Sequence, residues 1–160
     1  MPVNVVVHGT GRMASAIAAV SADREDVDVV ALVGPNPPER ETGLPYSPSL
    51  DVLDSHPAFL IDFTLPEGTL EAAKWSAARG VPMVSGVTGL SVKVTEALES
   101  ASTSVPVLWS PNLSIGVNLL ADLAGRAGQV LDNDVSVAIE DIHHQLKKDA
   151  PSGTALMLGE

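Results

Sequence analysis

The sequence predicts an α/β protein whose first part is a doubly wound parallel sheet. From residue 3 to about residue 109, short valine-rich segments alternate with alanine-rich segments of helical periodicity. Hydrophobic residues make up 45% of the 160-residue chain but aromatic residues only 3%, so the core must be aliphatic. Both observations are typical of a buried parallel sheet that is covered by helices.

The elements of this sheet can be placed in order. Residues 3–8 contain four valines and predict a buried strand, and residues 12–22 place Ala, Ile and Val on one helical face. Residues 27–33 predict a second buried strand, which the glycine and prolines of residues 34–38 end in a loop. The remaining predicted elements are a short helix at 49–54, strands at 59–63, 83–85 and 105–109, and helices at 69–79 and 91–102.

A second module is expected to follow residue 112. Residues 114–131 predict a long helix, and residues 135–142 alternate apolar with polar side chains, as a strand of a different sheet would. A lone strand is not stable, so its partner must come from elsewhere. We therefore expect residues 113–160 to be the start of a partial α+β module that assembles into a homo-oligomer.

Composition excludes several classes of function. The formal net charge is -11, and no basic stripe is present that could neutralise the phosphates of a nucleic acid. The absence of cysteine excludes disulfides and thiolate metal sites, and no other metal-ligand spacing is evident, so no metal is expected. No signal peptide and no apolar stretch of about 20 residues is found, so we expect a cytoplasmic protein without membrane contact.

A glycine-rich turn connects the first strand to the first helix. Residues 9–14, G-T-G-R-M-A, fit the pattern G-x-G-x-x-A in the required context of strand, turn and helix. The first glycine permits the turn, the second lets the backbone approach a pyrophosphate, and a small third residue lets helix and strand pack. The motif predicts a Rossmann-type dinucleotide-binding domain over residues 1–112. A tight turn in a fold that binds no nucleotide is the alternative.

The end of the second strand bears on the choice of cofactor. Domains that prefer NAD usually place a carboxylate there to hold the ribose hydroxyls, but this strand ends in Leu32, Val33 and Gly34. Arg40 follows and could meet a 2′-phosphate. The expected cofactor is therefore NADPH or NADH, with NADPH at least as plausible. Residues 62–68 and 86–89 follow two further strands, where ligands of such sheets bind, although ordinary turns are the alternative.

Residues 143–155, H-H-Q-L-K-K-D-A-P-S-G-T-A, gather two imidazoles and two ammonium groups before a predicted helix start. Ser152 or Thr154 can cap that helix, whose free N–H groups would bind an anion that Lys147 can also reach. The segment predicts a pocket for a small carboxylate or phosphate, with groups for proton transfer beside it. A polar strand end and a solvated loop are the alternative.

Taken in order, these segments resemble the dihydrodipicolinate reductase family, 4-hydroxy-tetrahydrodipicolinate reductases of lysine and diaminopimelate synthesis. The matching segments are residues 11–13 (G-R-M), 61–64 (I-D-F-T) with 66–67 (P-E), 86–89 (G-V-T-G), 111–118 (P-N-L-S-I-G-V-N) and 143–155.

The resemblance implies that the first domain binds NAD(P)H and that the second closes over a cyclic dicarboxylate. It implies that His143 is the general acid with Lys147 as its partner, and that His144, Lys147, Ser152, Gly153 and Thr154 bind the substrate carboxylate. The implied cofactor-binding residues are Gly9, Thr10, Gly11, Arg12, Met13, Phe63, Thr64, Gly86, Thr88, Pro111 and Asn112.

The chain also departs from the family pattern. The glycine turn is one residue short and has Ala14 in place of glycine, Val87 replaces threonine, and Asp141 replaces glutamate. The chain is also shorter than family members and lacks most of their C-terminal sheet, so we expect either a short form of the family or part of a longer protein. The expected function is reduction of 4-hydroxy-tetrahydrodipicolinate to tetrahydrodipicolinate with NAD(P)H. A repurposed homologue that acts on a related ring in secondary metabolism, or a non-catalytic binding or assembly protein, is the alternative.

Overall fold

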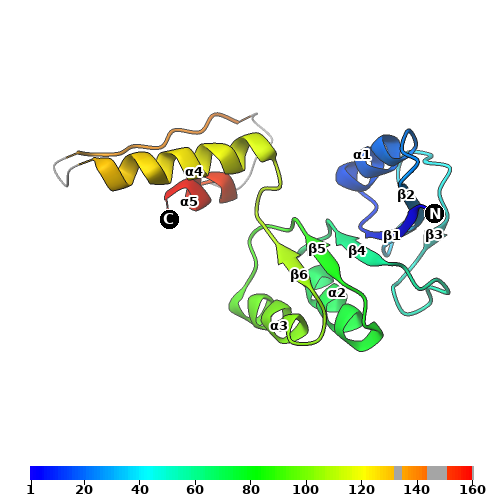
Figure 1. Cartoon of the computed structure of the whole chain (residues 1–160). Coiled ribbons are helices and arrows are strands. Elements are labelled where there is room, and N and C mark those ends of the chain that lie inside the picture. Colours follow the sequence, from blue (N-terminus) through cyan, green and yellow to red (C-terminus); the bar gives the residue numbers. More distant parts are fainter. Residues whose placement is uncertain (132–134, 144–150, 160) are drawn as a thin grey trace. The chain divides into compact units, whose positions relative to one another are not determined.

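The computed structural model describes residues 1–131, 135–143 and 151–159 (Figure 1). The chain divides into two compact units, Met1–Trp109 and Ser110–Glu160. The dinucleotide-binding and substrate-binding roles assigned to residues 1–112 and 113–160 stay predictions. No helix in the described part of the chain is both long and apolar enough to cross a membrane.

The first unit is built on a six-stranded sheet in which every adjacent pair of strands is parallel. The strand order is β3-β2-β1-β4-β5-β6, so the order reverses at β1, as in a doubly wound sheet. The predicted fold class is thereby confirmed. The strands are β1 (Val3–His8), β2 (Val27–Val33), β3 (Tyr46–Ser47), β4 (Phe59–Asp62), β5 (Met83–Ser85) and β6 (Val107–Trp109).

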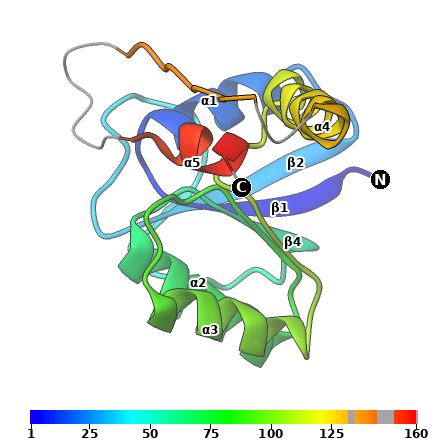
Figure 2. The ribbon, with the colours of Figure 1, turned by 90° about the vertical axis from the view of Figure 1, so that its left-hand side faces the viewer.

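Helices cover both faces of this sheet. Helix α1 (Arg12–Ser21) lies on one face, and α2 (Pro66–Arg79) and α3 (Val92–Ser102) lie on the other (Figures 1 and 2). The alternation of side chains along a strand sends Val5 and Val7 toward α1 and Val6 toward α2. Two aliphatic core clusters result, one on each face.

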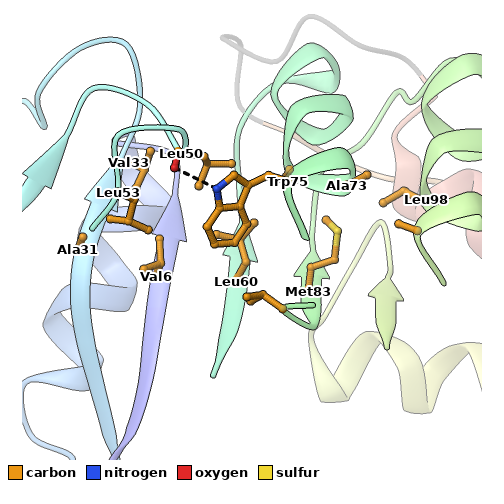
Figure 3. Close-up of a cluster of buried hydrophobic side chains, with 13 residues drawn as sticks. Val6, Ala31, Val33, Leu50, Leu53, Leu60, Ala73, Trp75, Met83 and Leu98 are labelled. Atoms are coloured by element: carbon orange, nitrogen blue, oxygen red, sulfur yellow. Dashed lines mark hydrogen bonds between the residues drawn. The ribbon is translucent and has the colours of Figure 1, made fainter. Parts of the chain in front are cut away.

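The larger cluster includes a hydrogen bond from an indole to a loop. The Nε1 of Trp75 in α2 donates to the backbone oxygen of Leu50 at 3.0 Å, and both residues are buried (Figure 3). The predicted helix at residues 49–54 is wrong. This segment makes a single turn, closed by the Leu53 N–H on the Leu50 oxygen, because burial of both leucines holds it against the sheet.

Other elements also differ from the sequence prediction. Helix α2 begins at Pro66 rather than at residue 69, because proline is favoured in the first helical turn, where its missing N–H costs nothing. Strand β3, a pairing of Tyr46 and Ser47 with Leu32 and Val33, was not predicted. It is too short to carry a periodic pattern.

The second unit contains α4 (Ile115–Val130) and α5 (Gly153–Gly159), which contact each other. None of the α4 residues is buried. The strand predicted at residues 135–142 is not formed within the described part of the chain. A strand requires a neighbour to accept and donate ladder hydrogen bonds, and no described segment supplies one to these residues.

Candidate functional site

A cleft of about 490 Å³ lies at the carboxyl ends of β1, β2 and β4, beside the point where the strand order reverses. This is the edge at which open α/β sheets bind ligands. The cleft is lined by His8, Gly9, Thr10, Gly11, Gly34, Pro35, Phe63, Thr64, Leu65, Glu67, Gly68 and Glu71.

The glycine turn at the floor of the cleft has the geometry that a pyrophosphate requires. Gly9 has a φ of +124°, and a Cβ at this position would lie 2.7 Å from the backbone oxygen of Phe63, so only glycine fits. Gly11 is the N-cap of α1 and has no side chain to satisfy the N–H groups of the first turn. A Cβ on Gly11 would meet open space. Free N–H groups beside open space fit the phosphates of a dinucleotide.

Behind the cleft, a buried carboxylate connects the ends of β4 and β5 with the start of α2. Asp62, the last residue of β4, is fully buried, and its Oδ2 accepts hydrogen bonds from the hydroxyls of Thr69 at 2.7 Å and Ser85 at 2.8 Å. Its Oδ1 accepts from the Thr64 hydroxyl at 2.6 Å and from the Thr64 N–H at 3.2 Å. The loops that follow β4 and β5 are therefore anchored on one side chain.

The same carboxylate faces the last residue of β1. The Nδ1 of buried His8 lies 3.5 Å from Asp62 Oδ1. Burial alone would raise the pKa of the Asp62 carboxyl, but the neighbouring imidazole and three hydroxyl donors outweigh it and hold that pKa below its usual value. Asp62 is thus an anion with its hydrogen-bond acceptors used internally, which suits a structural support rather than a proton-transfer group.

The charge of the cleft is negative. Glu67 and Glu71, from the first two turns of α2, are among its lining residues, which include no lysine or arginine. Arg40, which the sequence suggested for a 2′-phosphate, is exposed and is not among those residues. A phosphate placed beside these two carboxylates would be repelled by them, and the preference between NADPH and NADH stays a prediction.

The structure brings together some of the residues expected to bind the cofactor and not others. Five of them line the cleft: Gly9, Thr10, Gly11, Phe63 and Thr64. Arg12, Met13 and Thr88 are exposed and do not line it. Gly86 packs against the Phe63 ring, which leaves no room for a Cβ there.

Other lining residues were not identified from the sequence. His8 directly precedes the glycine turn, and this position is the sequence feature that could have predicted its place in the cleft. In the sequence, Gly34 stands out only because the end of the second strand has no carboxylate. In the structure, a Cβ on Gly34 would lie 3.1 Å from the Thr10 side chain. Glu71 gave no signal, since its place in the cleft depends on how α2 packs.

In the second unit, the predicted helix cap is present. Ser152 is buried and is the residue before α5, and its hydroxyl accepts a hydrogen bond from the Ala155 N–H at 3.0 Å. Thr154 lies in the first turn, where its Oγ1 accepts a hydrogen bond from Nδ2 of Asn112 at 2.9 Å. Ser152, Gly153 and Thr154 thus form one ordered turn, while Pro111 and Asn112 lie in the turn before α4.

The residues that are predicted to transfer the proton are described only in part. His143 is exposed, and its Nδ1 lies 3.6 Å from Oδ2 of Asp141. The predicted residues His144 and Lys147 lie outside the described residues.

Comparison with protein families matches nearly the whole chain. Residues 3–113 match the family model described as dihydrodipicolinate reductase, N-terminus, and residues 116–160 match the one described as dihydrodipicolinate reductase, C-terminus. The expected resemblance is thereby confirmed.

Two curated relatives agree with the family match. The chain is 42% identical over 164 residues to a 4-hydroxy-tetrahydrodipicolinate reductase of Stenotrophomonas maltophilia, covering 99% of this chain and 68% of that protein. It is 38% identical over 161 residues to the enzyme of the same name from Xylella fastidiosa, covering 98% of this chain and 67% of that protein.

The fold resembles dipicolinate-bound dihydrodipicolinate reductase from Paenisporosarcina sp. TG-14, with a TM-score of 0.71 at 24% identity, over 99% of this chain and 64% of that one. The chain thus spans about two thirds of the length of these relatives. With both family regions matched in order, and with more than 40% identity to a named reductase, the chain belongs to the dihydrodipicolinate reductase family, a family of NAD(P)H-dependent oxidoreductases.

Proposed function

We propose that this chain takes part in the reduction of 4-hydroxy-tetrahydrodipicolinate to tetrahydrodipicolinate with NADPH or NADH, a step of lysine and diaminopimelate synthesis. The observation that carries the proposal is the 42% identity to a 4-hydroxy-tetrahydrodipicolinate reductase over 99% of the chain. The cleft at the glycine turn adds independent support, since its geometry fits a dinucleotide.

The first unit would hold the cofactor. The N–H groups at the start of α1 would bind the pyrophosphate, with Gly9 keeping the turn clear of the β4 exit. Phe63 and Thr64 would form the opposite wall. When bound, the reduced nicotinamide supplies the hydride. Contacts of Gly86, Thr88, Pro111 and Asn112 on the nicotinamide side stay predictions.

The second unit would bind the substrate and supply the proton. The Ser152-Gly153-Thr154 turn offers backbone N–H and hydroxyl donors to one carboxylate, with His144 and Lys147 as the predicted cationic partners. His143 would donate a proton from Nε2, because its Nδ1 faces Asp141.

We also propose that the chain assembles as a homo-oligomer through residues 113–160. Apolar side chains of α4 and of residues 135–142 are exposed, among them Ile115 at 87%, Val137 at 76% and Ile142 at 89%. Pairing of residues 135–142 with a second copy would cover part of this surface. Light scattering over a dilution series tests it, and a monomer at every concentration would contradict it. The cytoplasmic location stays a prediction.

The proposed reaction can be tested directly with freshly generated 4-hydroxy-tetrahydrodipicolinate. Oxidation of NADPH or NADH, followed by absorbance, is expected with the wild-type chain and not with Gly11→Asp, whose carboxylate would meet the pyrophosphate. Gly11→Ala is the matched control, because a Cβ at this position meets nothing within 4 Å. Cofactor binding without oxidation by the wild-type chain would contradict the proposal and favour a non-catalytic binding protein.

A further inference from the structure

The side chain of Asn112 connects two segments that are far apart in the sequence. Its Nδ2 lies 2.9 Å from the Thr154 hydroxyl in the first turn of α5, across 42 residues of sequence. Its Oδ1 accepts a hydrogen bond of 2.9 Å from the Ser114 N–H, at the N-cap of α4. One amide therefore joins the starts of both helices of the second unit.

These two bonds determine the direction of the hydrogen bond to Thr154. A backbone N–H can only donate, so the atom of Asn112 that faces Ser114 must be the oxygen. The atom that faces Thr154 is then the NH₂ group, which can only donate as well. Thr154 must therefore accept from Asn112 through Oγ1, and its own hydroxyl hydrogen must point to a different acceptor.

The backbone of Asn112 is held as firmly as its side chain. Its carbonyl oxygen accepts from the Ser110 hydroxyl at 2.8 Å and from Nδ2 of Asn118 at 2.9 Å. The same Asn118 amide also donates to the Ser114 oxygen at 2.8 Å. The turn at 110–114 is thus locked onto α4, and the amide of Asn112 has a defined position from which to act on Thr154.

We propose that Asn112 is a positioning residue for carboxylate recognition: it holds Thr154 as an acceptor and so directs the Thr154 hydroxyl hydrogen to a substrate carboxylate. This inference rests on the proposed function, in which the Ser152-Gly153-Thr154 turn binds one carboxylate. It assigns Asn112 a role beyond the cofactor contact expected from the sequence. The free hydroxyl of an unconstrained threonine would instead be able to present its lone pairs to the anion.

The decisive variant is Asn112→Asp. It has nearly the same shape, and its carboxylate still accepts the Ser114 N–H, but it can no longer donate to Thr154. It would take the Thr154 hydrogen for itself and place a negative charge beside the bound anion. The matched control is Gln129→Glu, the same amide-to-carboxylate change on an exposed residue of α4.

Binding of pyridine-2,6-dicarboxylate, measured by titration calorimetry in the presence of NADH or NADPH, is the main readout. Asn112→Asp is expected to weaken this binding by about 10–100-fold, the range for a lost hydrogen bond to a charged group. The KM is expected to rise by a similar factor with the loss of binding. Gln129→Glu is expected to leave all of these values unchanged.

Thr154→Val and Thr154→Ser separate this inference from the proposed function. If Thr154→Val weakens dicarboxylate binding and Asn112→Asp does not, the role of Asn112 is refuted while the carboxylate site stands. If neither variant changes the binding shown by wild type, or if wild type does not bind the dicarboxylate, both the site and the role of Asn112 are refuted. Thr154→Ser, which keeps the hydroxyl, is expected to bind nearly as wild type.

Should Asn112→Asp fail to fold, Asn112→Ser takes its place. A serine hydroxyl can still accept the Ser114 N–H but is too short to reach Thr154. It is expected to raise KM and the dissociation constant of the dicarboxylate by about fivefold, because the hydrogen bond to Thr154 is lost but no negative charge is added. An unchanged dicarboxylate affinity in a folded Asn112→Ser variant would overturn the inference.

Discussion

The Ser85 hydroxyl donates a hydrogen bond of 2.8 Å to Oδ2 of Asp62, so the last residues of β4 and β5 are joined through their side chains. The two residues are also register partners in the parallel ladder. Because loops that carry predicted cofactor-binding residues leave both strands here, this contact fixes the distance between those loops at their base.

Asp62→Asn is expected to lower the free energy of unfolding by about 2–3 kcal/mol, because an amide would place NH₂ against hydroxyls that now donate to a buried carboxylate. Urea unfolding followed by circular dichroism measures the loss. Asp51→Asn, at an exposed position, is the matched control and should change the stability by less than about 0.5 kcal/mol. Equal stability of both variants would contradict the support role of Asp62.

The same carboxylate makes stability depend on pH in the acid range. The pKa of Asp62 is lower in the folded chain than in the unfolded chain, so the unfolded state binds the proton more readily. The stabilisation is complete above the unfolded value of about 3.9 and is lost as the pH falls through the lower folded value. The difference in unfolding free energy between wild type and Asp62→Asn should therefore shrink below about pH 4. A difference that stays constant down to about pH 2 would contradict this.

Gly9 and Gly43 provide a matched pair for the cost of a side chain at positive φ. Both have φ in the left-handed region, +124° and +69°, but a Cβ would strike the Phe63 oxygen only at Gly9. Gly43→Ala is expected to cost about 1 kcal/mol and Gly9→Ala about 3 kcal/mol or more. Thermal unfolding compares the two variants, and similar losses would mean that the β4 exit moves aside without cost.

Glu71→Gln is expected to change the cofactor preference. Removal of one negative charge from the cleft should strengthen NADPH binding about two- to fivefold relative to NADH, since only NADPH carries the extra phosphate. Fluorescence titration with each cofactor gives the ratio. Glu96→Gln on α3, whose side chain does not line the cleft, is the control. A preference that stays the same in Glu71→Gln would place the 2′-phosphate away from α2.

His143→Ala is expected to lower kcat by about 100-fold with little change in cofactor affinity, as for loss of a general acid. Lys147→Ala is expected to impair both turnover and substrate binding. Steady-state kinetics with the freshly generated substrate distinguish these effects, with His56→Ala as the control histidine in the other unit. Wild-type rates in both variants would show that neither residue takes part in the reaction. The segment would then be a carboxylate-binding site at most.

The family motifs and most of the elements could be predicted from local patterns. The four valines of Val3–His8 predict β1. The spacing of the glycines after this strand is typical of a turn between a strand and a helix. Proline before them and apolar residues after them predict a helix start capped by Ser152 or Thr154, and Ser152 provides the cap. These features depend on neighbours in the chain, which is why the sequence alone predicts them.

Contacts between distant segments were decided only by the tertiary structure. Leu50 lies in a turn rather than a helix because it is buried beneath Trp75, which lies 25 residues later. Asp62 obtains its donors from positions 7 and 23 residues away, and Asn112 meets Thr154 across 42 residues. A local pattern determines which backbone conformation a segment prefers, but the pairing of polar side chains depends on where packing brings those segments together.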